Sequence, residues 1–135
     1  MKKILLLLSG LIGLSAFTMS DNEDLKESIA RGKVVYENNC VSCHMADGTG
    51  VAGTFPPLAK SDYLTKSTKE AIKGVKYGLQ GSIVVNGEEY DSMMPEAGLD
   101  DQEVTDVMNY ILNTWGNTYS RMITVKEVQE IKRDE

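Results

Sequence analysis

The sequence predicts a small all-α domain that carries one short β-hairpin. Apolar residues with helical spacing lie in two segments near the ends of the chain, and the region between them is rich in loops. About 115 residues remain after a short N-terminal segment, which suits one domain with one core. We therefore expect an N-terminal and a C-terminal helix that pack together, with loops between them.

The first 20 residues are typical of a secretory signal peptide. Met1, Lys2 and Lys3 precede an apolar stretch from Ile4 to Phe17. This stretch is short for a membrane span, which usually needs about 18 or more apolar residues. We expect cleavage near residue 20, leaving residues 21–117 as the domain and residues 118–135 as a C-terminal extension with a short helix. The alternative is an uncleaved anchor. In both cases we expect the domain to be periplasmic or otherwise exported. If the signal is removed, we expect no stable membrane insertion.

The charge balance excludes one class of partner. Without Lys2 and Lys3 the chain has 12 basic and 20 acidic residues, and its formal charge falls from -6 to -8. Such an acidic domain lacks the basic surface that binds nucleic acid. The segment Glu88 to Asp106 holds eight acidic residues and no basic one, whereas Lys60 to Lys76 holds five lysines. One of these patches is predicted to steer a partner; the alternative is two solvated faces.

The first helix is predicted over Asp24 to Asn39. Its apolar residues recur at helical intervals with a glycine on the same side: Leu25, Ile29, Gly32, Val35 and Tyr36. A glycine inside a helix costs about 1 kcal/mol relative to alanine. A close crossing with another helix would explain why Gly32 stands there; the alternative is simple tolerance of a glycine.

The segment Cys40-Val41-Ser42-Cys43-His44 has the Cys-x-x-Cys-His pattern of c-type haem attachment. Two thiols on one helical turn can each form a thioether to a vinyl group, and the next residue, His44, then lies where its imidazole can bind the iron. The rival interpretations are weaker. A thioredoxin-like pair needs a strand-helix-strand context, a zinc site needs four ligands, and a disulfide across three residues constrains little chain.

The second iron ligand is predicted to be a methionine. His44 is the only histidine, which excludes two histidine ligands from one chain. Met94 is favoured because Pro95 biases it toward an extended backbone that projects its side chain from a loop. Met93 is the alternative ligand, and both could merely pack. The other candidates adjoin His44 (Met45), fill the core (Met108) or lie in the tail (Met122).

Short signals define the remaining elements. The glycines around Gly50 predict a wrapping loop that leads to Pro56, and a carbonyl of this Pro-Pro stretch could accept the second N–H of the histidine. Ser67 and Glu70 suggest the cap of a helix that ends at Tyr77. Asn86-Gly87, within Ile83 to Tyr90, predicts a hairpin that delivers the methionine loop.

The C-terminal helix is the most strongly patterned element. Asp100 and Glu103 form a capping-box signature, and the apolar residues from Val104 to Trp115 keep a 3-4 rhythm until Gly116. A second signature, Thr124 with Glu127, predicts a final short helix in the extension.

The order helix, Cys-x-x-Cys-His, Pro-Pro-Leu, Met-Pro and terminal helix resembles the class I cytochrome c family over essentially all of the chain after residue 20. The resemblance implies the cytochrome c fold, with one covalent haem c in a hydrophobic crevice. It implies that the Pro56 carbonyl accepts the N–H of His44 and that Met94 is the distal ligand. Gly50 to Leu58 and Asn113 to Asn117 are similar to haem domains associated with some copper nitrite reductases.

These features imply a soluble, exported electron carrier rather than an enzyme, with one haem iron that cycles between Fe(III) and Fe(II). Expected partners are redox proteins, such as a nitrite reductase or another oxidoreductase, or a terminal oxidase, and the carrier is expected to be monomeric. The first alternative is a haem subunit held permanently by a dehydrogenase or reductase. The second is an enzyme or ligand sensor with an open iron position.

Overall fold

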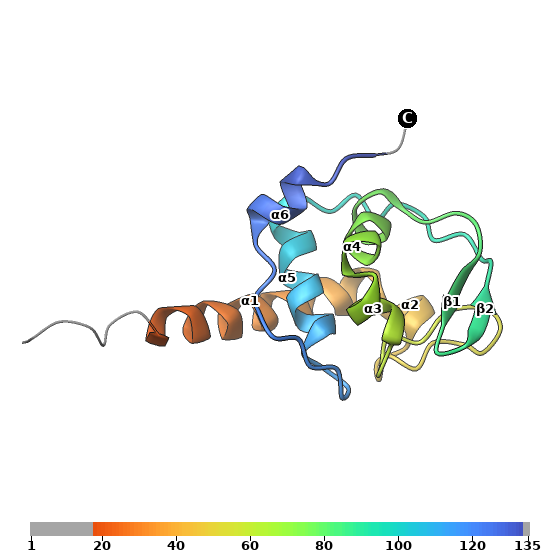
Figure 1. Ribbon diagram of the computed structural model, residues 1–135, viewed down its shortest axis with the longest axis horizontal. Helices are drawn as coiled ribbons and strands as arrows, with labels where there is room; N and C mark the ends of the chain where they lie inside the picture. The colour runs from red at the N-terminus through yellow and green to blue at the C-terminus, as the bar shows by residue number, and fades with distance from the viewer. Residues whose placement is uncertain (1–17, 134–135) are drawn as a thin grey trace, which may run out of the picture.

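The computed structural model describes residues 18–133, and residues 1–17 of the predicted signal peptide lie outside this range. Helices surround a central core, and a two-stranded antiparallel hairpin lies at one side of it (Figure 1). Within residues 18–133, no helix has the length and apolar character needed to cross a membrane. The elements in chain order are α1 (Thr18–Asn39), α2 (Val41–His44), α3 (Asp62–Lys66), α4 (Thr68–Tyr77), β1 (Ile83–Val85), β2 (Glu88–Tyr90), α5 (Asp101–Leu112) and α6 (Val125–Glu130).

The crossing of α1 and α5 is the central packing contact, as the sequence predicted. Gly32 lies directly on the backbone of α5: a Cβ atom added there would be 1.9 Å from the carbonyl oxygen of Asp106 and 2.9 Å from Cβ of Tyr110. No side chain larger than hydrogen fits between two backbones at this separation. The close helix crossing inferred for Gly32 is therefore confirmed.

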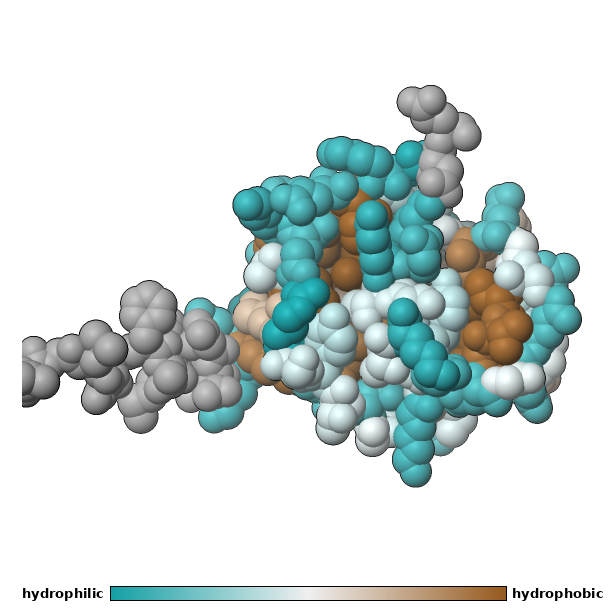
Figure 2. All heavy atoms as spheres, viewed as in Figure 1, coloured by the Kyte–Doolittle hydropathy of each residue, from teal (hydrophilic) through white to brown (hydrophobic). Residues whose placement is uncertain are grey.

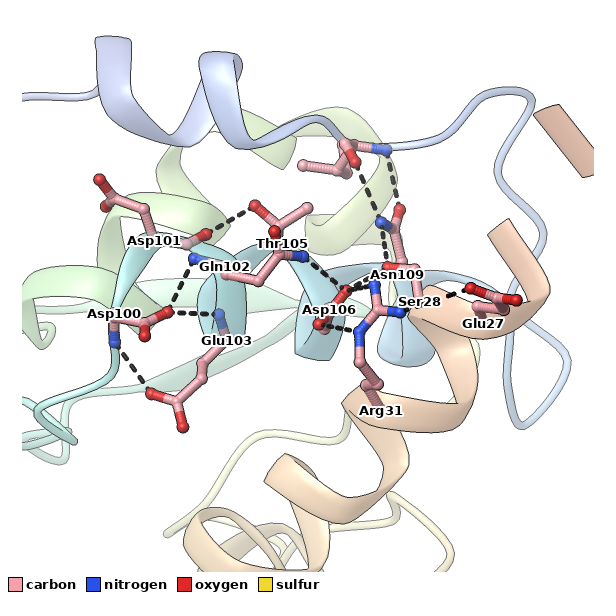
Figure 3. Close-up of polar contacts among 11 residues, drawn as sticks. Glu27, Ser28, Arg31, Asp100, Asp101, Gln102, Glu103, Thr105, Asp106 and Asn109 are labelled. Carbon is pink, nitrogen blue, oxygen red and sulfur yellow. Dashed lines mark hydrogen bonds and ion pairs between the residues drawn. The ribbon is translucent and has the colours of Figure 1, made fainter. Parts of the chain in front are cut away.

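A polar network crosses the same helix pair. Asp106 is buried on α5, and Arg31 of α1 binds it through Nε (2.7 Å) and Nη2 (2.9 Å) (Figure 3). The hydroxyl of Ser28 donates to the same carboxylate at 2.6 Å, and Gln102 donates to it at 3.1 Å. Because buried carboxylates need such partners, the network fixes the rotation of each helix about its axis at the crossing.

Helix α5 begins as predicted but ends earlier. Both hydrogen bonds of the Asp100–Glu103 capping box are present. The helix stops at Leu112, so the prediction that it continues to Trp115 was wrong. Trp115 instead has a positive φ of 52°, and its ring packs on the rings of Tyr36 and Tyr110 at centroid distances of 4.9 and 5.3 Å. Aromatic packing has overridden the helical periodicity.

The middle of the chain holds one element that the sequence analysis missed. Helix α3 spans five residues, too few for a periodic pattern. Helix α4 follows at once and begins at Thr68, but Ser67 makes no side-chain cap, so the predicted cap at Ser67 was wrong. Thr68 Oγ1 donates to the Leu64 carbonyl of α3 instead, at 2.7 Å.

The predicted hairpin is present. Asn86 and Gly87 have positive φ values of 53° and 86°, as a type I′ turn requires, and Val85 pairs with Glu88 across the turn. Asp62 and Asn86 then exchange two hydrogen bonds: each side chain accepts from the other's backbone N–H, at 2.7 and 3.0 Å. This pair holds the hairpin against the start of α3.

The C-terminal extension packs on the core. Its predicted capping box at Thr124 and Glu127 is present and starts α6. Ile123, Val128 and Ile131 are buried. The buried side chain of Asn109 accepts from the backbone N–H of Ile123 and donates to its carbonyl. These contacts tie the extension to α5.

Candidate functional site

The two cysteines and the histidine lie on one helical turn. Cys40 precedes α2, and its carbonyl accepts from the backbone N–H of Cys43 (3.2 Å) and of His44 (3.0 Å). The cysteines are partly buried and form no disulfide with each other. Burial, with a smaller effect of Cys43, raises the pKa of the Cys40 thiol to about 11. Cys40, Cys43 and His44 therefore share one short helical turn that ends at the histidine.

His44 is buried and held by a hydrogen bond at one ring nitrogen. Its Nδ1 is 3.0 Å from the carbonyl oxygen of Pro56, the acceptor that the family resemblance implied. Since a carbonyl only accepts, Nδ1 carries the hydrogen and Nε2 keeps a free lone pair. Burial lowers the pKa of the imidazole, and the bond to Pro56 offsets this only in part. His44 is therefore a neutral imidazole with Nε2 available to bind a metal.

The loop after α2 places the Pro56 carbonyl beside the His44 imidazole. Met45 has a φ of 64°, which ends the helix, and its own carbonyl accepts from the hydroxyl of Tyr36 at 2.7 Å. Gly50 N–H donates to the His44 carbonyl at 3.1 Å, and a Cβ atom on Gly50 would lie 2.7 Å from the oxygen of Pro56. The loop can fold back onto the histidine because this position has no side chain.

An apolar hollow opens beside His44. Its larger part has an empty volume of about 620 Å³, and a second part of about 440 Å³ adjoins it. Cys40 lines the first part and Cys43 the second, and α4, the hairpin and α5 supply much of the wall. Five residues line both parts: His44, Pro56, Leu79, Ile83 and Met94. The hollow thus has a histidine, two thiols and three methionines (Met93, Met94 and Met108) on otherwise mostly apolar walls.

The structure separates the two candidate methionines. Met94 is partly buried and lines both parts of the hollow, and its backbone exchanges two 2.9 Å hydrogen bonds with Leu79. Met93 is 63% exposed, and its sulfur lies 3.5 Å from the Nε2 donor of Gln80. Of these two residues, Met94 lines the larger part together with His44, whereas Met93 lines only the second part.

The other methionines lie where the sequence analysis placed them, with one addition. Met108 is fully buried in the core, as expected, and it also lines the larger part of the hollow. Met122 lies by the α1–α5 pair with Arg31 and Gln102, away from the hollow. The sequence analysis missed Leu79, whose pairing with Met94 leaves no local signal because the two residues are far apart in the chain.

The residues present fit a haem group. A porphyrin needs a hydrophobic space, two thiols at its edge and ligand atoms at its iron, and this hollow has all of these. Within residues 18–133, no cluster of three His, Cys, Asp or Glu side chains is placed to hold a metal ion. Fold and site together define the class: a helical, single-haem c-type cytochrome.

Comparison with known proteins gives the same class. Residues 29–115 match the family model described as cytochrome c. Cytochrome c-552 of Thermus thermophilus is 35% identical over 112 residues, covering 76% of this chain and 85% of the relative. The chain therefore belongs to the cytochrome c family. Membership implies a covalently attached haem c and a role in electron transfer.

Two further relatives are subunits of larger assemblies. The cytochrome c subunit of a quinone-type alcohol dehydrogenase from Gluconobacter oxydans is 32% identical over 75% of this chain. The cytochrome c subunit of gluconate 2-dehydrogenase from Pantoea cypripedii is 30% identical over 77% of it. The chain covers 22% and 24% of these two relatives. Family members thus include small cytochromes and the haem subunits of dehydrogenases.

Proposed function

We propose that this chain is an exported one-electron shuttle whose haem is attached at Cys40 and Cys43. His44 Nε2 and Met94 Sδ are the two iron ligands in this proposal. When bound, the haem supplies one-electron Fe(III)/Fe(II) chemistry, and a sulfur ligand raises its reduction potential. The export signal lies on residues 1–20, residues 21–117 form the cytochrome domain and residues 118–135 the extension.

The observation that carries the proposal is the placement of His44 and Met94 on one hollow. The Pro56 carbonyl orients the imidazole of His44, and the Leu79 backbone holds the main chain of Met94 beside the hollow. A preorganised pair of ligands needs little rearrangement when the iron changes charge. The apolar walls also exclude water, which suits electron transfer rather than substrate chemistry.

Met94→Ala tests the ligand assignment, with Met93→Ala as its matched control. In the ferric holoprotein, Met94→Ala should abolish the sulfur-to-iron charge-transfer band and lower the reduction potential, because a sulfur ligand favours Fe(II). Met93→Ala should leave both nearly unchanged, since the Met93 side chain is exposed. Loss of the band in Met93→Ala, or its survival in Met94→Ala, would contradict the assignment.

The surface supports a redox protein as the partner. Apolar side chains gather over the hairpin on one face of the molecule (Figure 2). Val84 of β1 is 59% exposed. Exposed acidic residues lie along the same hairpin and the following loop: Glu88, Glu89 and Asp91. An apolar patch beside acidic groups suits transient docking to a partner with basic residues around its own redox centre. A nitrite reductase, another oxidoreductase or a terminal oxidase would present such a centre.

The first alternative function is a permanently bound haem subunit, which the relatives from dehydrogenases suggest. The shuttle is favoured because the Thermus cytochrome c-552 is more similar to this chain, at 35% identity, than these two subunits are, at 32% and 30%. Gel filtration of the protein from its native source separates the two proposals. A shuttle elutes as a monomer, whereas a subunit elutes with its dehydrogenase or reductase.

A further inference from the structure

Residues 118–133 form a C-terminal strap that lies outside the matched cytochrome c region, residues 29–115. The strap is anchored on α4 as well as on α5. Lys76 Nζ donates to the carbonyl of Val128 at 2.9 Å, and the hydroxyl of Tyr77 donates to the carbonyl of Ile131 at 3.1 Å. The side chains of Val128 and Ile131 are buried. The strap is therefore fixed up to Ile131, two residues before Arg133.

Arg133 contacts two segments that meet at the candidate ligand. Its Nη2 atom lies 2.6 Å from a carboxylate oxygen of Glu96, and its guanidinium lies over the ring of Tyr77, 4.7 Å from the centroid. Tyr77 comes two residues before Leu79, and Glu96 comes two residues after Met94. Arg133 thus joins the two segments just outside the Leu79–Met94 backbone bridge.

The segments 77–79 and 94–96 are also in close contact between the Leu79–Met94 bridge and Arg133. A Cβ atom on Gly78 would lie 2.8 Å from the carbonyl oxygen of Met94 and 3.1 Å from the backbone nitrogen of Glu96. Outside the bridge, residues 91–99 have no helix or strand, and most of them are exposed. Such a loop opens easily unless its surroundings restrain it. The bridge itself supplies only two hydrogen bonds.

We propose that Arg133 is a positioning residue that clamps the Leu79–Met94 bridge from outside and keeps the Met94 sulfur in the hollow. The inference rests on the proposed function, in which Met94 binds the iron. The arginine reaches Glu96 and Tyr77 from a segment that is already anchored, so little chain entropy is lost when both contacts form. Removing it frees the methionine loop to open, without exposing any core residue.

Imidazole is the probe for this opening, because it binds ferric iron when the methionine leaves. In a titration of the ferric holoprotein, loss of the sulfur-to-iron charge-transfer band reports the exchange. For an exposed ion pair plus one cation–π contact, Arg133→Ala should bind imidazole about three- to tenfold more tightly than wild type. Lys132→Ala is the matched control, since Lys132 is exposed and donates to the nearby carbonyl of Gln129. Its imidazole affinity should match wild type.

A second variant checks the partner of the clamp. Glu96→Gln should also raise the imidazole affinity. In the double variant, Arg133→Ala with Glu96→Gln, the fold-increase in imidazole affinity should be smaller than the product of the two single fold-increases. High salt should raise the imidazole affinity of the wild type, because it weakens the Arg133–Glu96 ion pair, and should leave the imidazole affinity of Arg133→Ala nearly unchanged.

Two results would overturn the clamp alone. One is an unchanged imidazole affinity in Arg133→Ala, even if its denaturant midpoint falls. The other is an equal rise in Lys132→Ala. A charge-transfer band that survives in Met94→Ala would instead overturn the ligand assignment, and the clamp with it.

Discussion

Replacing Gly32 by alanine tests the packing on which the fold depends. On an exposed helical position this change stabilises a protein by up to about 1 kcal/mol. Here the new methyl group would lie 1.9 Å from the carbonyl oxygen of Asp106, and contacts under 3.0 Å are not tolerated. Helices α1 and α5 must therefore separate by about 1 Å or more at their crossing, because a backbone atom cannot rotate away.

The expected result is a net loss of about 2 to 3 kcal/mol in the free energy of unfolding, at the upper end of the cost of overpacking a core, because the clash involves a backbone atom. For a domain of this size the midpoint temperature should fall by roughly 10 °C. Separation of the helices also loosens the contacts of Asp106 with Ser28 and Arg31. Guanidinium unfolding of the holoprotein, followed by circular dichroism, measures the loss.

Ala30→Gly is the matched control, because Ala30 is an exposed residue of the same helix. It should lose only about 1 kcal/mol, through helix propensity. The two positions thus prefer opposite residues: alanine at 30 and glycine at 32. Equal or greater stability of Gly32→Ala, with an unchanged denaturant slope, would refute the close crossing.

Two further predictions concern charge. Burial raises the pKa of Asp106, but hydrogen bonds from Arg31, Ser28 and Gln102 outweigh it and hold the pKa below its ordinary value of 3.8. The stabilisation is therefore complete about one pH unit above this ordinary value, and it is lost as the pH falls toward and through the folded-state value. The advantage of wild type over Asp106→Asn in unfolding experiments should shrink between about pH 5 and pH 3; a constant difference would contradict this. Separately, stopped-flow electron transfer to a basic redox partner should slow steeply with ionic strength, and rates that ignore salt would argue against electrostatic steering.

The acidic stretch shows how tertiary structure revises a charge count. Of its eight acidic residues, Asp106 is buried and pairs with Arg31, which is half exposed. Asp101 pairs with Lys76 at 2.8 Å, and Glu96 pairs with Arg133 at 2.6 Å. These three residues hold the fold and the strap together. Asp100 and Glu103 are exposed but form the capping box of α5. The predicted partner surface is accordingly reduced to Glu88, Glu89 and Asp91 of the hairpin and the methionine loop.

Sequence reasoning worked best where the chemistry is local. Cys40, Cys43 and His44 share one helical turn, so their spacing alone defines the haem motif. The Asn86-Gly87 turn and the capping boxes of α5 and α6 were also predictable, because each involves residues within three positions of one another. Local hydrogen bonds and φ preferences need no knowledge of the rest of the chain.

The sequence by itself therefore determined the cofactor and the helical class, and it offered a close helix crossing as one of two explanations for Gly32. Only the tertiary structure decided which residues that are distant in the sequence contact one another. It placed the Asp106 carbonyl over Gly32, paired Leu79 with Met94, drew Trp115 out of its helix and carried Arg133 to Glu96. Each of these contacts joins residues that no periodic pattern links. They form because packing and the burial of polar groups are satisfied over the whole core at once.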